Sequence, residues 1–218
     1  MKVWIYVEGR SDELALKALW ENWRTKLRRE GHGIEVIPLD NKSKFFRKIG
    51  PRAAEKLIAN KEHIVIGLPD LYPNQPYTGT KYEHGNMAQL KSVQKREVSA
   101  ALQNVFGISS QQVRQLLERF LPSALKHDLE MLLLAAQDEL RSYLGTPDHL
   151  GDWRDRVEEQ NQQRPPRHIV EDLFRTKSRT RRAYRDTKDA SAVLRNVTDI
   201  KTIIYNVNDQ VTNQSIIY

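Results

Sequence analysis

Residues 3–12 read Val3-Trp4-Ile5-Tyr6-Val7-Glu8-Gly9-Arg10-Ser11-Asp12. The first five are consecutive apolar residues, rich in β-branched and aromatic side chains, and predict a strand covered on both faces, as in a parallel sheet. Gly9 then interrupts the strand, and Ser11 is the expected N-cap of a helix. The apolar face of that helix recurs at helical spacing through Leu16, Leu19, Trp20, Trp23 and Leu27. Strand, loop and amphipathic helix together indicate the beginning of an α/β fold.

The same alternation continues along the chain. We expect strands at 34–39 and 63–68, a short helix at 52–60 with Pro51 near its start, a long loop at 69–85, helices at 87–106 and 111–119, an extended segment at 120–125 and a helix at 128–144. The βαβαβ order predicts an α/β fold with an open, mainly parallel sheet flanked by helices, followed by a mostly helical C-terminal part.

Two regions are expected in the chain. Residues 1–145 would form the α/β domain, and residues 146–218 a helical, basic extension packed on that same domain. The Gln- and Pro-rich run 160–166 is the clearest linker, while 206–218 is either an edge strand or a loose tail.

The composition of the chain limits the metal ligands and the membrane segments that it could contain. The chain has 218 residues and no cysteine, so a metal site must use oxygen or imidazole ligands. No apolar run approaches the ~20 residues of a membrane-spanning helix, and no signal peptide is evident, so we expect a cytoplasmic protein without membrane association.

The formal net charge of +7 is concentrated in one segment. Residues 164–188 hold nine basic and three acidic residues, a net charge of +6. Clustered Lys and Arg bind polyanions by releasing counterions, but a solvated helical face explains the charge equally well. The candidate nucleic-acid-binding residues are Arg179, Arg181, Arg182 and Arg185.

Carboxylates follow two of the expected strands. Glu8 comes directly after the first strand, Asp12 lies four residues later, and Asp70 follows the strand at 63–68. Residues just beyond the carboxyl ends of parallel strands line the ligand crevice of such sheets. Mg²⁺ or Mn²⁺ would find suitable oxygen ligands there. Glu8 and Asp12 could instead simply favour the positive start of a helix.

Further candidates lie toward the C-terminus. Asp128 and Glu130, in His127-Asp128-Leu129-Glu130, open an apolar helix and are either capping residues or additional metal ligands. Lys188 could stabilise charge on a phosphoryl group, or could be a surface lysine.

These residues carry a family resemblance. Val7-Glu8-Gly9-Arg10-Ser11-Asp12 with a later strand-end Asp70 resembles a TOPRIM domain, the metal-binding module of topoisomerases, primases and related nucleases. The order of motifs, continuing through His127-Asp128-Leu129-Glu130 to Tyr184 and Lys188, resembles the bacterial domain-of-unknown-function family 4276 over residues 1–205.

The resemblance implies roles for individual residues. Glu8 would act in metal binding or as general acid–base, and Asp70 would be the first aspartate of an Asp-x-Asp pair whose second position is Tyr72 here. Overcoming-lysogenisation-defect-type TOPRIM nucleases add a second acid, a later Glu and a Lys. By the same order, the predicted catalytic residues are Glu8 and Lys188, and the predicted metal ligands are Glu8, Asp12, Asp70, Asp128 and Glu130.

The expected function is that of a metal-dependent nuclease or phosphoryl-transfer domain acting on nucleic acid, with DNA favoured over RNA. The resemblance also implies bacterial defence with a partner ATPase, since this chain has no Walker motif. A homo-oligomer is left open. The alternative is a catalytically inactive TOPRIM-like module that binds nucleic acid or protein, which Tyr72 favours.

Overall fold

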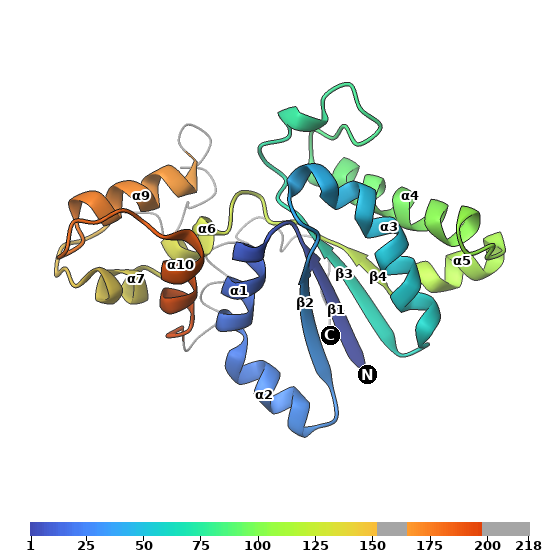
Figure 1. Ribbon diagram of the computed structural model, residues 1–218, viewed down its shortest axis with the longest axis horizontal. Coiled ribbons are helices and arrows are strands. Elements are labelled where there is room, and N and C mark those ends of the chain that lie inside the picture. Colours follow the sequence, from blue (N-terminus) through green and yellow to red (C-terminus); the bar gives the residue numbers. More distant parts are fainter. Residues whose placement is uncertain (152–164, 198–218) are drawn as a thin grey trace. The chain divides into compact units, whose positions relative to one another are not determined.

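The computed structural model describes residues 1–151 and 165–197 (Figure 1). The chain forms two compact units. The first comprises residues 1–13 and 20–126, and the second comprises residues 14–19 and 127–218. The units divide earlier in the chain than the boundary at residue 145 that the sequence suggested. The expected linker at 160–166 and the C-terminal residues 206–218 lie largely or wholly outside the described residues.

The first unit is built on a parallel sheet, as predicted. Its strands are β1 (Lys2–Val7), β2 (Gly33–Pro38), β3 (His63–Leu68) and β4 (Phe120–Pro122), in the spatial order β2-β1-β3-β4. All three pairings are parallel, with Tyr6 level with Gly67 and Ile37. Since β1 is flanked by strands that follow it in sequence, the strand order reverses between β1 and β3. Open α/β sheets bind ligands at such a switch point, beyond the carboxyl ends of the strands.

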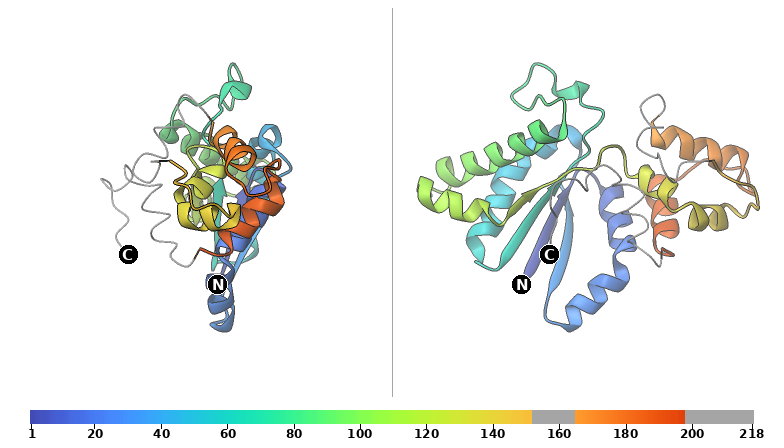
Figure 2. Two further views of the ribbon diagram at one scale, coloured as in Figure 1. Left: turned by 90° about the vertical axis from the view of Figure 1, so that its left-hand side faces the viewer. Right: turned by 180° about the vertical axis from the view of Figure 1, so that it is seen from behind.

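Helices connect the strands. They are α1 (Arg10–Leu19), α2 (Glu21–Arg29), α3 (Lys42–Ala59), the short 3₁₀ helix η1 (Gln75–Tyr77), α4 (Met87–Asn104) and α5 (Ser110–Leu117). The apolar faces of α3 and α4 meet one face of the sheet, where Tyr6, Val65 and Phe120 are buried. Figure 2 shows α3 and α4 side by side on this face.

Two glycines allow this close packing. A Cβ at Gly50 of α3 would lie 2.6 Å from the backbone oxygen of Glu97 in α4. A Cβ at Gly67 of β3 would lie 1.9 Å from the side-chain oxygen of Gln94, which is fully buried and donates to the Ser123 carbonyl at 2.8 Å. The helices therefore approach each other and the sheet more closely than a larger residue would allow.

Pro51 does not begin its helix, contrary to the sequence prediction. α3 begins at Lys42, where the Asn41 side chain accepts a hydrogen bond from the Lys44 N–H and caps the helix. Pro51 sits inside the helix on its exposed side. Because apolar residues on both sides of the proline are buried against the sheet and α4, their packing outweighs its missing hydrogen bond.

The long helices expected from periodicity are interrupted. Ser11 is not the N-cap, because the first helix already begins at Arg10 and ends at Leu19, and Trp20 has a non-helical ψ of 14°. Trp23, expected on the buried face, is consequently 47% exposed on α2. The helix expected at 128–144 is likewise divided at Ala136, whose ψ is 54°.

The second unit is mainly helical, in agreement with the predicted fold class. Its helices after residue 126 are α6 (Glu130–Ala135), α7 (Gln137–Leu144), α9 (Pro166–Thr176) and α10 (Asp186–Leu194). All six residues of α6 are buried, which explains its continuous apolar sequence. In the described ranges, 1–151 and 165–197, no helix has the length and apolar character needed to cross a membrane.

Candidate active site

Three strand ends of the first unit bring polar groups together at the carboxyl edge of the sheet. Glu8 follows β1 and is only 7% exposed. Its Oε1 accepts a hydrogen bond from the backbone N–H of Asp70, which follows β3, at 3.2 Å. Lys42, four residues after β2, places its Nζ 3.6 Å from the same oxygen and donates to the Asp70 carbonyl at 3.2 Å. The Glu8 carboxylate and the Asp70 backbone therefore meet at the switch point, and the convergence of the two carboxylates stays a prediction.

The surroundings of Glu8 shift the pKa of its carboxyl group. Burial raises its pKa to about 7, and the nearby Asp12 carboxylate adds to the rise. The Lys42 ammonium and the Asp70 N–H oppose it, because both favour the ionised form. The result is a buried carboxyl group that can take up or release a proton near neutral pH.

Asp12 has a structural task at the start of α1. Its Oδ2 accepts a hydrogen bond from the backbone N–H of Gly9 at 2.8 Å, so the side chain reaches back across the first turn of the helix. This is the capping role that the sequence left open for Asp12.

Lys42 and Tyr77 were not identified from the sequence. The Tyr77 hydroxyl, from the loop after β3, donates to the Lys42 carbonyl, and burial beside Glu8 and Asp70 raises the pKa of the Tyr77 hydroxyl. Lys42 could have been found, because it follows the second strand just as Glu8 and Asp70 follow theirs. Placing the helix start at Pro51 obscured that position.

Tyr72 occupies the place of the second aspartate of an Asp-x-Asp pair. Its hydroxyl donates to the Gly85 carbonyl at 3.3 Å and the side chain is half-buried. Tyr72 therefore closes the loop at 69–85 and supplies no carboxylate to this edge of the sheet.

Glu130 and Asp128 belong to the second unit. Glu130 is 5% exposed, and burial together with Asp186 and Asp128 raises its pKa to about 7. The Tyr184 hydroxyl lies beside it and lowers the pKa slightly, although this buried oxygen has no hydrogen bond of good geometry among the described residues. Arg167 reaches the same corner, with its Nη1 3.7 Å from the Asp186 carboxylate. Glu130 is thus a second buried carboxyl group that titrates near neutral pH.

The basic segment is partly neutralised from within. Asp189 is fully buried and accepts hydrogen bonds from both terminal nitrogens of Arg182, at 2.7 and 2.8 Å. It also accepts from the backbone N–H of Arg185 at 2.7 Å, its guanidinium at 3.2 Å, and the Tyr143 hydroxyl at 2.9 Å. These bonds lower the pKa of Asp189 to about 2. Two of the four candidate arginines therefore hold the second unit together.

The other basic candidates are open to solvent. Arg179, Arg181 and Lys188 are exposed, and no ion pair involves them within the described residues. Lys188 lies in the first turn of α10, two residues after Asp186. These three side chains remain candidates for contact with an anionic ligand.

Metal binding by Glu8, Asp12, Asp70, Asp128 and Glu130 stays a prediction of the sequence. Across residues 1–151 and 165–197, no three His, Asp or Glu side chains gather closely enough to hold an ion together. In the first unit the nearest charged partner of Glu8 is the ammonium group of Lys42, and Asp12 is engaged at the helix start. Glu8 and Asp12 therefore already have partners at this edge of the first unit, and no group of three acidic or imidazole ligands for Mg²⁺ or Mn²⁺ is present among the described residues.

Comparisons with known proteins give a loose structural likeness. No protein-family profile matches the chain, and no curated protein matches it significantly in sequence. Structures of the C-terminal region of the Xanthomonas campestris pv. campestris OLD protein are similar to it. The structure phased with mercury aligns at a TM-score of 0.43 and 14% identity, covering 95% of this chain and 94% of that one. The structures phased with iodine and with platinum give TM-scores of 0.41 and 0.39, identities of 14% and 16%, and coverage of 95% of this chain with 94% and 92% of theirs.

Proposed function

We propose that this chain is a TOPRIM-type nuclease domain that hydrolyses phosphodiester bonds of nucleic acid, with Glu8 as its general acid–base. The observation that carries the proposal is the position of Glu8: buried, at the switch point of a parallel sheet, and held by the Asp70 N–H beside the Lys42 ammonium. A structural role alone would not require a carboxyl group at this position. An apolar side chain would fill the space without the cost of burying a polar group.

The chemistry assigned to Glu8 is proton transfer. As its carboxylate takes a proton from the attacking water, the water oxygen bonds to phosphorus and the bond to the leaving oxygen breaks. The leaving oxygen keeps the electron pair and takes a proton from solvent water, and the protonated Glu8 then returns its own proton to solvent. General bases work best when their pKa lies near the operating pH, and that of Glu8 is about 7. Lys42 fixes the carboxylate and offers a positive charge at the same edge. A role of Lys188 in stabilising phosphoryl charge stays a prediction of the sequence resemblance.

The test is a cleavage assay with a matched control. Plasmid, single-stranded DNA and RNA are incubated with the wild type and Glu8→Gln in Mg²⁺, in Mn²⁺ and in EDTA. We expect Glu8→Gln to lose at least about 100-fold in rate. Glu97→Gln changes another largely buried carboxylate, the partner of Lys81 on α4, and should leave the rate unchanged. Equal rates for wild type and Glu8→Gln would refute the assignment.

A second candidate function is a catalytically inactive binding module. Three observations favour it: Tyr72 replaces a carboxylate, Asp12 caps a helix, and no three-ligand group is present among the described side chains. Binding of nucleic acid by the wild type, without cleavage in any of the three ionic conditions, would select this function.

Kinship with family 4276, a role in defence and a partner ATPase remain predictions of the sequence resemblance. The partner ATPase can be tested by measuring cleavage with the chain alone and with an ATPase encoded beside it. Stimulation by ATP in the presence of that partner is the expected result.

A further inference from the structure

α2 differs from the other long helices of the first unit because it has no buried residue. None of its nine residues is buried. It lies along β2, where the Arg24 guanidinium donates to the Ile34 carbonyl at 3.3 Å. A helix without a buried residue contributes little to a core, so its sequence is free to serve another purpose.

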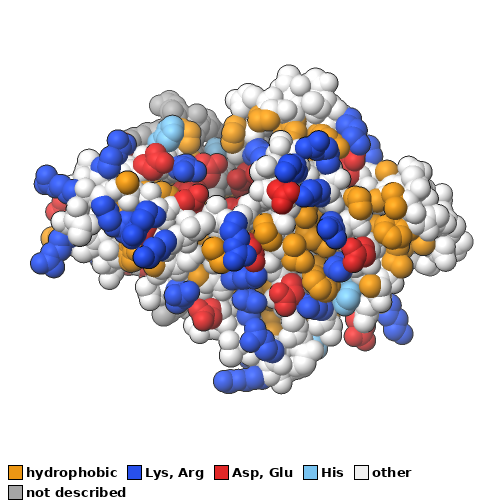
Figure 3. Space-filling model, viewed as in Figure 1, with side chains coloured by type: hydrophobic (Ala, Val, Ile, Leu, Met, Phe, Trp, Pro, Cys, Tyr) orange, Lys and Arg blue, Asp and Glu red, His pale blue; other side chains and the backbone are white. Residues whose placement is uncertain are grey.

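The charge of α2 is strongly positive and unpaired. The helix holds four basic residues, Arg24, Lys26, Arg28 and Arg29, against one acid, Glu21. Within the described parts of the chain, no carboxylate forms an ion pair with any of the four. Figure 3 shows Lys and Arg side chains over α2. The surplus of +3 in nine residues is denser than the surplus of +6 in the 25 residues of the segment 164–188.

An exposed aromatic ring lies among the basic side chains of α2. Trp23 is 47% exposed and meets Trp20 edge to face, with ring centroids 6.3 Å apart. Trp23, Lys26 and Arg29 follow one another at three-residue spacing, so their side chains form one stripe along the helix. The edge-to-face contact with Trp20 restricts the Trp23 side chain. Stacking of the Trp23 ring on a base would therefore cost little side-chain conformational entropy.

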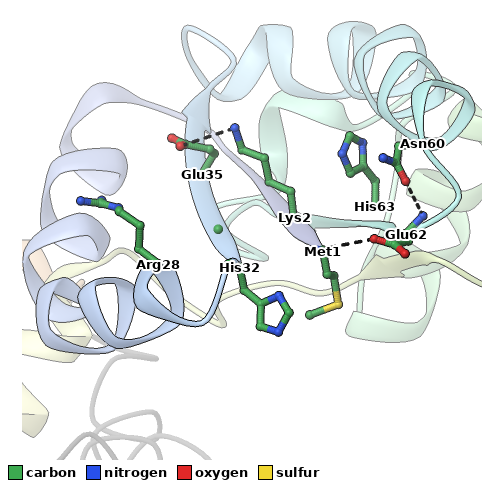
Figure 4. A pocket seen from close by; sticks show the side chains of 10 residues that line it. Met1, Lys2, Arg28, His32, Glu35, Asn60, Glu62 and His63 are labelled. Atoms are coloured by element: carbon green, nitrogen blue, oxygen red, sulfur yellow. Dashed lines mark hydrogen bonds and ion pairs between the residues drawn. The ribbon is translucent and has the colours of Figure 1, made fainter.

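The C-terminal end of α2 borders a hollow of about 460 Å³ (Figure 4). Arg28 lines it together with His32, His63 and the paired side chains of Lys2 and Glu35, whose charged atoms are 3.7 Å apart. Since Glu35 is already matched by Lys2, Arg28 adds uncompensated positive charge beside the hollow.

We propose that α2 binds single-stranded nucleic acid, with Lys26 and Arg29 contacting phosphates and Trp23 stacking on an unpaired base. Basic residues interleaved with an exposed aromatic ring are what single strands need, since each nucleotide offers a phosphate and a base face. In a duplex the base faces are stacked and inaccessible. A lipid surface would need a broad apolar face, and α2 has one exposed tryptophan instead.

The proposed function supplies the class of ligand, nucleic acid, on which this inference rests. Binding by α2 does not require that the chain cleaves its ligand. It is therefore tested by binding in EDTA, where metal-dependent cleavage is silent. The probe is a 5′-fluorescein-labelled thymidine oligonucleotide of about 20 nucleotides, longer than a typical single-strand binding site. Its anisotropy is followed against the full chain at several salt concentrations.

Lys26→Glu with Arg29→Glu should weaken binding at least about ten-fold and reduce the slope of log Kd against log salt by about 1.4, for two lost phosphate contacts. The matched control is Lys91→Glu with Lys95→Glu, which makes the same charge change on exposed positions of α4. It should shift affinity by less than about two-fold, as an effect of net charge alone.

Trp23→Ala should weaken binding about five-fold or more, while Trp23→Phe keeps a ring and most of the affinity. Equal losses in the α2 and α4 variants, or no binding by the wild type, would overturn the proposal. So would Trp23-dependent binding to vesicles of phosphatidylcholine and phosphatidylglycerol with unchanged oligonucleotide binding. Cleavage that survives in the Lys26→Glu/Arg29→Glu variant with unchanged affinity would reject this surface and leave the proposed nuclease intact.

Discussion

Replacing Glu130 by glutamine should make the protein more stable at alkaline pH, although it alters a buried residue. Glutamine has nearly the shape of a protonated glutamate and cannot ionise. Burial, Asp186 and Asp128 raise the pKa of Glu130 from 4.5 to about 7, so the folded protein holds this carboxyl group protonated where the unfolded chain would release the proton. Its contribution to stability is complete below about pH 4.5 and is lost as the pH rises through about 7.

The magnitude follows from the shift. At 1.36 kcal/mol per pKa unit, a rise from 4.5 to about 7 corresponds to about 3 kcal/mol between the two extremes of pH. Over the accessible interval from about pH 5 to about pH 8.5, most of this difference, about 2 to 3 kcal/mol, should be observed. Glu8 titrates in both proteins and cancels when the two are compared.

Urea unfolding of wild type and Glu130→Gln at several pH values measures the effect. The stability of the variant relative to the wild type should rise with pH across this interval. Glu139→Gln, a partly exposed position on α7, is the control and should show no such trend. A pH-independent difference, or a variant that loses stability relative to wild type above pH 7, would show that Glu130 is ionised in the folded protein and would refute the reasoning.

Three further perturbations have defined outcomes. Asp189→Ala should cost about 3 to 5 kcal/mol in urea unfolding, because it leaves two guanidinium groups without their buried partner, and a loss below about 1 kcal/mol would contradict this. Gly50→Ala should cost about 1 to 3 kcal/mol, since its Cβ would lie 2.6 Å from the Glu97 carbonyl oxygen, and an unchanged Tm would show that α3 and α4 separate easily. Lys42→Met should move the acidic limb of the pH–rate profile upward by about one unit, because it removes the cation that lowers the pKa of Glu8, and an unmoved limb would exclude that coupling.

The sheet and the position of Glu8 could be predicted because the information is local. Five consecutive apolar residues before Glu8 specify a strand buried on both faces, and the polar residue that ends such a strand lies at its carboxyl edge. The same reasoning placed Asp70. Register and strand order then brought the two together without any further sequence signal.

Helix interruptions were not predictable in the same way. Leu16 through Leu27 keeps helical periodicity across Trp20, yet the chain turns there and exposes Trp23. At Pro51 the opposite happens, since a residue that usually ends or begins a helix is carried inside one by packing on both sides. At Pro51 tertiary contacts outweigh the local signal, and the misplaced helix start concealed Lys42.

The net charge of a sequence segment does not show which of its cations are already paired in the folded protein. The segment 164–188 ends one residue before Asp189, the buried acid that takes up two of its arginines. Its net charge of +6 therefore overstates the positive charge available to a ligand. α2 has a smaller formal surplus, but among the described residues no carboxylate pairs with its cations, and Arg24 alone donates to a backbone carbonyl. Because a phosphate competes with any carboxylate already bound to a guanidinium, affinity for nucleic acid should follow the unpaired cations rather than the total, and this favours α2 over Arg182 and Arg185.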